Sequence, residues 1–127
     1  MERVCPCGSG SPYPACCGRF HSGAATAPTA EALMRSRYSA YARRDADYLR
    51  RTWHPATRPK RLEFEPSLVW TRLEVRFTTG GTLFDTEGTV LFEAHYSDSG
   101  RAGFMTENSR FVKEDGQWLY VGPVTST

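Results

Sequence analysis

Four cysteines near the start of the sequence have the clearest capacity for chemistry. They lie within a span of thirteen residues, and the rest of the sequence has none: Cys5, Cys7, Cys16 and Cys17. Zinc prefers four tetrahedral thiolate or imidazole ligands. Gly8 and Gly10 permit the backbone dihedrals that bend the CPCGSG turn around an ion. The spacing therefore favours one structural zinc ion held by all four cysteines.

Three other arrangements of these residues remain open. His21, four residues after Cys17, is a substitute ligand in a set with the first three cysteines. An iron–sulfur cluster uses the same thiolates. Two disulfides suit small secreted scaffolds, but the opening MERVCPCGSG has no apolar segment typical of a secretory signal. We therefore expect reduced cysteines and a cytoplasmic location.

Length and composition limit the classes of fold that are possible. The chain has 127 residues, 39% hydrophobic and 24% charged, which favours a single globular domain with a small appendage. Aromatic residues make up 13%, so an aromatic-rich core or pocket is expected. No apolar run approaches the roughly 18 residues needed to span a bilayer. The composition thus argues against a membrane protein.

Charge is unevenly distributed along the chain. Residues 1–61 carry a net charge of +7, and residues 62–127 carry −5. A basic half is one feature of nucleic-acid-binding proteins. The basic residues form no contiguous stretch, however, since Pro59 interrupts the longest cluster at Arg58, Lys60 and Arg61. We therefore interpret them as solvated surface residues and do not expect nucleic-acid binding.

Two helices are predicted after a small, polar linker at residues 18–28. Thr29 is a suitable N-cap for a helix that runs to about residue 44, with apolar residues at helical spacing. A second helix is predicted over residues 45–54, where Leu49 and Trp53 share a face and Pro55 ends the helix.

Four strands are predicted in the second half of the chain. Alternation begins at Trp70, Gly80-Gly81 marks a turn, and a second strand has Val90 and Phe92 on one face. A third strand spans about residues 103–113, and Asp115-Gly116 is a hairpin signal before a fourth strand. Two helices followed by an antiparallel meander indicate an α+β fold. Curled around the first helix, such a sheet forms a cone whose wide end is a natural pocket.

Six residues are candidates for lining that pocket: Arg37, Tyr41, Trp53, His54, Glu107 and Ser109. Arg37 interrupts the apolar stripe of the first helix, so it either faces inward and pairs with Glu107 or reaches solvent. His54 is either a proton shuttle or a residue that bonds a free carbonyl at a helix end. Tyr38, Tyr41 and Glu107 are of the types that form an acid–base site. No spacing fixes their geometry, so we favour a non-enzymatic binding protein over a small acid–base enzyme of the isomerase or dehydratase type.

The cysteine segment resembles a known motif. Cys5-Pro6-Cys7-Gly8-Ser9-Gly10, Tyr13 and Cys16-Cys17-Gly18 are similar to the SEC-C motif, the zinc-binding tail of the preprotein translocase ATPase SecA. The resemblance implies a zinc knuckle over residues 1–22 that interacts with a protein partner. It also implies that the fourth ligand directly follows the third cysteine, which favours Cys17 over His21.

The rest of the chain resembles the YchJ family of uncharacterised bacterial proteins. The matching segments are TAEALMRSRYSAY from Thr29, Thr52-Trp53-His54-Pro55, Glu107-Asn108-Ser109-Arg110-Phe111 and Asp115-Gly116-Gln117-Trp118-Leu119-Tyr120. The resemblance implies a cone-shaped nuclear transport factor two-like (cystatin-like) domain over residues 29–124, after the knuckle. It implies no activity. The expected partners are thus a protein at the knuckle and a small ligand in the cone.

Overall fold

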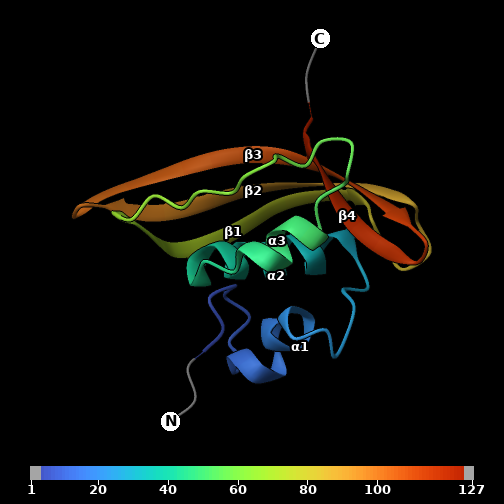
Figure 1. Cartoon of the computed structure of the whole chain (residues 1–127), viewed down its shortest axis with the longest axis horizontal. Helices are drawn as coiled ribbons and strands as arrows, with labels where there is room; N and C mark the ends of the chain where they lie inside the picture. Colours follow the sequence, from blue (N-terminus) through green and yellow to red (C-terminus); the bar gives the residue numbers. More distant parts are fainter. Residues whose placement is uncertain (1–3, 125–127) are drawn as a thin grey trace.

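One antiparallel sheet and two layers of helical segments make up the fold. The computed structural model describes residues 4–124, so residues 1–3 of the predicted knuckle lie outside the described residues. The sheet order is β1-β2-β3-β4, with β1 at Leu68–Gly80, β2 at Glu87–Asp98, β3 at Arg101–Glu114 and β4 at Gln117–Pro123. Helices α2 (Ala30–Arg43) and α3 (Ala46–Arg51) lie between this sheet and the short segments η1 (Tyr13–Ala15) and α1 (Cys17–His21) (Figure 1). The predicted α+β architecture is confirmed.

The first predicted helix corresponds to α2. Thr29 caps it, because its side-chain oxygen accepts a hydrogen bond from the backbone N–H of Ala32 at 3.0 Å. The helix ends where Arg44 adopts a left-handed conformation. The helical spacing seen in the sequence therefore gave both ends of α2 closely.

The second helix, α3, is shorter than predicted. It ends at Arg51 instead of continuing to His54, because the next residues pair with β4. The N–H of Tyr120 donates to the carbonyl of Thr52, and the N–H of His54 donates to the carbonyl of Tyr120, both at 2.8 Å. A long-range pairing thus overrides the local helical pattern.

The sheet presents one face to the helices. In β2, Val90, Phe92 and Ala94 are buried against α2, whereas Glu93 and His95 alternate with them on the outer face. The β3–β4 hairpin closes at Asp115-Gly116, and both residues have positive φ, as a two-residue hairpin of this type requires. The core lies between α2 and the sheet and contains Leu33, Met34, Tyr38, Tyr48, Leu49, Leu73, Val90, Phe92, Phe111 and Trp118.

Residues 18–28 are not the independent linker that was predicted. Phe20 and Ala27 are buried in the core of the domain. Nη2 of Arg51 donates to the carbonyls of Phe20 and His21, at 3.1 and 2.7 Å. Phe20, a large apolar residue in an otherwise small and polar segment, is the feature of the sequence that indicates this packing. The cysteine-rich segment is therefore docked on the domain.

Within residues 4–124, no helix has the length and apolar character needed to cross a membrane.

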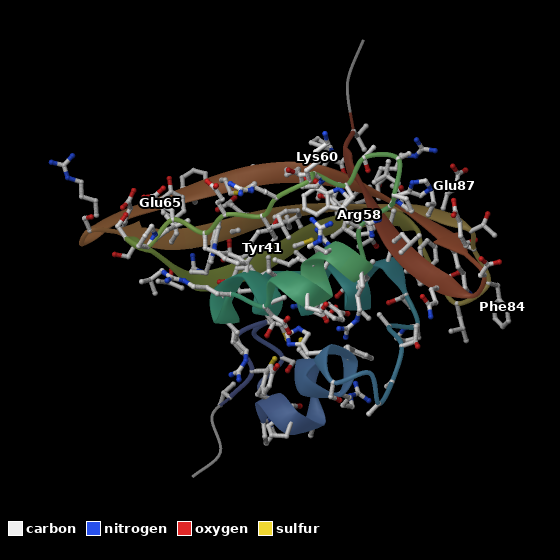
Figure 2. The ribbon with its side chains drawn as sticks, viewed as in Figure 1. Tyr41, Arg58, Lys60, Glu65, Phe84 and Glu87 are labelled. Atoms are coloured by element: carbon white, nitrogen blue, oxygen red, sulfur yellow. The ribbon has the colours of Figure 1, made fainter. Side chains whose placement is uncertain are left out.

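We expect that Phe20→Ala will lower the free energy of unfolding by about 3 kcal/mol, because it removes a large buried side chain that joins the two layers. Phe20 is 7% exposed. Phe84→Ala is the matched control, since Phe84 lies at the edge of the molecule (Figure 2) and is 92% exposed. It should change stability by less than about 0.5 kcal/mol. Urea denaturation measures both, and equal small effects would contradict the docked arrangement.

Candidate functional site

The four cysteine sulfurs converge on one point. Their Sγ atoms all lie within 4.8 Å of one another, and the sulfurs of Cys7 and Cys16 are 3.6 Å apart. Four sulfurs around a zinc ion at about 2.3 Å lie about 3.8 Å apart in a tetrahedron. The separation also excludes a disulfide between these two residues, since a disulfide needs about 2.05 Å. The cluster therefore fits a single metal ion held by four thiolates.

Two tight backbone segments bring the cysteine pairs together. The N–H of Cys5 donates to the carbonyl of Ser11 at 2.8 Å, which closes the first loop. Gly8 and Gly10 both have φ of +86°, a conformation that L side chains rarely adopt. The second pair, Cys16 and Cys17, occupies the junction between η1 and α1.

Among the thiols, that of Cys7 is arranged to carry a negative charge, whereas burial raises the pKa of Cys16. The pKa of Cys7 falls to about 4, chiefly because the thiol of Cys17 donates a hydrogen bond to it and Ser9 adds further bonds. The pKa of Cys17 rises because it is the donor in that bond and because it is buried. The hydroxyl of Ser9 also lies 3.1 Å from the sulfur of Cys16. A thiolate held by neighbouring donors is the form in which cysteine binds a metal.

His21 lies outside this cluster. Its Nδ1 hydrogen-bonds the hydroxyl of Tyr13, and its Nε2 lies 2.8 Å from the carbonyl oxygen of Ser36 on α2. Burial lowers the pKa of His21. With both nitrogens engaged, His21 links the cysteine-rich segment to α2, and the geometry favours Cys17 as the fourth ligand.

Further contacts fix the cysteine-rich segment on α2. Nη1 of Arg35 donates to the carbonyl of Cys7 at 3.1 Å. The sulfur of Cys5 lies 3.7 Å from the hydroxyl of Ser39, which is buried. These contacts and the His21 bond place the cysteine cluster against α2, the helix that carries Arg37.

A cavity of about 230 Å³ lies on the other side of α2, against the inner face of the sheet. The structure brings four of the six predicted pocket residues to it: Arg37, Tyr41, Glu107 and Ser109. Figure 2 shows Tyr41 between α2 and the sheet. The other lining residues are all apolar or aromatic: Met34, Tyr38, Trp70, Phe92, Ala94, Met105 and Tyr120.

Arg37 faces inward, which is one of the two orientations left open by the sequence, and is only 3% exposed. The predicted direct pair with Glu107 is wrong. Nη1 of Arg37 donates instead to the carbonyl of Leu49 at 2.8 Å and to the hydroxyl of Thr52 at 2.7 Å. The early end of α3 makes the carbonyl of Leu49 available to Arg37. In a continuing helix the N–H of Trp53 would donate to that carbonyl, but here it donates to the carbonyl of Arg50.

Aromatic rings complete the surroundings of the guanidinium. Its central carbon lies 4.8 Å from the ring centre of Trp53 and 4.6 Å from that of Tyr120. Burial lowers the pKa of Arg37 to about 10, so it stays charged at neutral pH. Trp53 therefore supports Arg37 but does not itself line the cavity.

Tyr120 also lines the cavity, although the sequence analysis did not name it as a pocket residue. Its hydroxyl donates to Oε2 of Glu107 at 2.7 Å while its ring faces Arg37, so it stands between the two charges. The hydroxyl of Ser109 donates to the same carboxylate oxygen. The sequence pattern that could have identified Tyr120 is the alternation along β4, which places it on the same inner face of the sheet as Trp118 and Phe111.

His54 does not belong to the cavity. Its Nε2 lies 2.8 Å from a carboxylate oxygen of Glu114, on the outside of the fold. The pairing of residues 52–54 with β4 turns this side chain away from the lining residues. The interpretation of His54 as a proton shuttle in the pocket is therefore wrong.

A second group of potential ligands, Glu74, Glu93 and His95, lies on the outer face of the sheet. Nη2 of Arg76 bonds both carboxylates, at 2.8 and 3.1 Å. A guanidinium already occupies the position that a cation would take, so we interpret this group as a surface ion-pair network.

Arg37→Ala should lower the free energy of unfolding by about 2–4 kcal/mol, because it removes two buried hydrogen bonds and two cation–aromatic contacts. Arg72→Ala on the exposed outer face is the control and should cost less than about 1 kcal/mol. Chemical denaturation of both variants tests this. A loss below about 1 kcal/mol for Arg37→Ala would show that its contacts contribute little.

Comparison with known proteins identifies relatives of nearly full length. The model of the YchJ middle NTF2-like domain matches residues 29–123. A UPF0225 protein of Streptomyces coelicolor is 56% identical over 116 residues, which cover 91% of this chain and 90% of that protein. A UPF0225 protein of Deinococcus radiodurans is 48% identical over 119 residues, covering 94% and 87%.

Solved structures extend the likeness to the cysteine-rich segment. The solution structure of a SEC-C motif containing protein from Rhodopseudomonas palustris matches with a TM-score of 0.81 and 32% identity over 100% of both chains. The crystal structure of a SEC-C motif containing protein from Psychrobacter arcticus matches with a TM-score of 0.79 and 27% identity, covering 98% of this chain and 84% of that one. The chain therefore belongs to the YchJ (UPF0225) family, in which a SEC-C motif accompanies an NTF2-like domain.

Proposed function

We propose that this protein is a non-enzymatic binding protein whose SEC-C segment holds one structural zinc ion. The observation that carries the proposal is the convergence of four cysteine sulfurs on the side of α2 opposite the cavity. Cys5, Cys7, Cys16 and Cys17 would hold the ion. Four thiolates leave no position for water, so zinc bound there supplies folding free energy rather than catalysis.

The cavity supports binding better than acid–base chemistry. An acid or base works best when its pKa lies near the operating pH. Burial raises the pKa of Tyr38 to about 12 and raises that of Tyr41 and Tyr120 as well, while Arg37 titrates near 10. These groups keep one protonation state at neutral pH. Since His54 lies elsewhere, the acid–base enzyme is the weaker alternative.

The cysteine-rich segment also offers a surface for a protein partner. Its inner side contacts α2 through Arg35 and His21, whereas residues 8–11 of its first loop are exposed. A partner that recognises the knuckle would meet this loop, and a small ligand would meet the cavity.

The zinc proposal is tested by elemental analysis of the purified full chain. We expect about one zinc per chain, retained in His21→Gln and lost or much reduced in Cys17→Ser, because a closed site needs all four thiolates. His21→Gln is the matched control, since it alters the neighbouring residue that the cluster does not use.

Three results would contradict this assignment. They are iron in place of zinc, the absence of any metal, and loss of the metal in His21→Gln with retention in Cys17→Ser. The last result would restore His21 as the fourth ligand.

A further inference from the structure

The cavity beside α2 has mostly apolar walls, but two side chains of opposite charge also line it. Arg37 and Glu107 are the charged residues among those that line it. No nitrogen of Arg37 lies within 4.0 Å of a carboxylate oxygen in the described part of the chain. Arg37 is buried and Glu107 is half-buried. A buried charge without a direct counter-charge is costly, so Arg37 in particular requires polar partners.

Arg37 has donors left over. Its Nη1 donates to the carbonyl of Leu49 and the hydroxyl of Thr52, and the hydroxyl of Tyr41 also hydrogen-bonds the guanidinium. A guanidinium has five N–H donors in a rigid fork that suits a carboxylate. The remaining donors therefore favour an acceptor group from outside the protein.

Glu107 has a free acceptor in the same cavity. Its Oε2 receives hydrogen bonds from Ser109 and Tyr120, but Oε1 receives none from the described residues. An anionic ligand alone would be repelled by this carboxylate, and a cationic ligand alone would be repelled by Arg37. A group with both signs satisfies both side chains.

The remaining walls define the rest of the ligand. Met34, Trp70 and Phe92 offer apolar and aromatic surface. The cavity of about 230 Å³ has room for roughly eight non-hydrogen atoms, at about 30 Å³ for each water-sized group. The ligand is therefore small and has one apolar end.

We propose that this cavity binds a small zwitterion with an apolar tail, such as a hydrophobic α-amino acid. Its carboxylate bonds the free donors of Arg37, its ammonium bonds Oε1 of Glu107, and its side chain packs against Met34, Trp70 and Phe92. This inference rests on the proposed binding function and specifies the class of ligand.

Calorimetric titration of the zinc-loaded full chain tests the proposal with four probes. L-leucine carries both charges, 4-methylpentanoate only the carboxylate, 3-methylbutylamine only the ammonium, and toluene neither. We expect leucine to bind at least about tenfold more tightly than either half-molecule, because only leucine pairs both the buried guanidinium and the half-buried carboxylate.

Variants separate the two charged contacts. Arg37→Met should remove the advantage of leucine over 3-methylbutylamine, and Glu107→Gln should remove its advantage over 4-methylpentanoate. Glu93→Gln changes a carboxylate on the opposite face of the sheet and should leave binding unchanged. Metal content and circular dichroism verify that each variant is folded, and Glu107→Gln still tests the proposal if Arg37→Met is not.

Three other outcomes are possible, and each would contradict the proposed ligand in a different way. If 4-methylpentanoate binds as tightly as leucine, Glu107 makes no contact and the zwitterion is wrong. If toluene binds and leucine does not, the ligand class is wrong but the binding function stands. If none of the four probes binds, this inference fails, whereas the zinc assignment is decided separately by the elemental analysis.

Discussion

Helix α2 packs against the sheet with one side and against the cysteine-rich segment with the other. On the sheet side, Leu33, Met34 and Tyr38 are buried in the core. On the opposite side, Arg35 and the carbonyl of Ser36 bond the cysteine-rich segment directly. Since a helix of this length gains most of its stability from packing, we expect both layers to contribute to its stability.

The buried guanidinium of Arg37 depends on this arrangement. Its acceptors are the carbonyl of Leu49 and the hydroxyl of Thr52, at the end of α3, and its ring contacts come from Trp53 and Tyr120. These partners are correctly placed only when α2, α3 and β4 pack together. The cysteine cluster and the cavity therefore lie on opposite sides of α2, the helix that carries Arg37.

Local patterns predicted the parts of this arrangement that depend on neighbouring residues. Cysteine spacing predicted the cysteine cluster, and Thr29 marked the start of α2. Helical periodicity placed Arg37 on the apolar stripe but left open whether its guanidinium faces inward or reaches solvent. Its partner was predicted wrongly, because the free carbonyl of Leu49 exists only where α3 ends early. That ending depends on the pairing of residues 52–54 with Tyr120, which is remote in sequence. The same pairing moved His54 out of the pocket, and no local pattern reveals it.

Hydrogen–deuterium exchange with and without a chelator tests most directly whether the knuckle supports α2. If it does, metal removal should raise the exchange of α2 amides as well as those of residues 4–21, because the helix loses one of its two packing layers. Amides of β2 on the far side of the core serve as the internal reference. An increase confined to residues 4–21, with α2 unchanged, would contradict the account and show that the domain holds its helix without the knuckle.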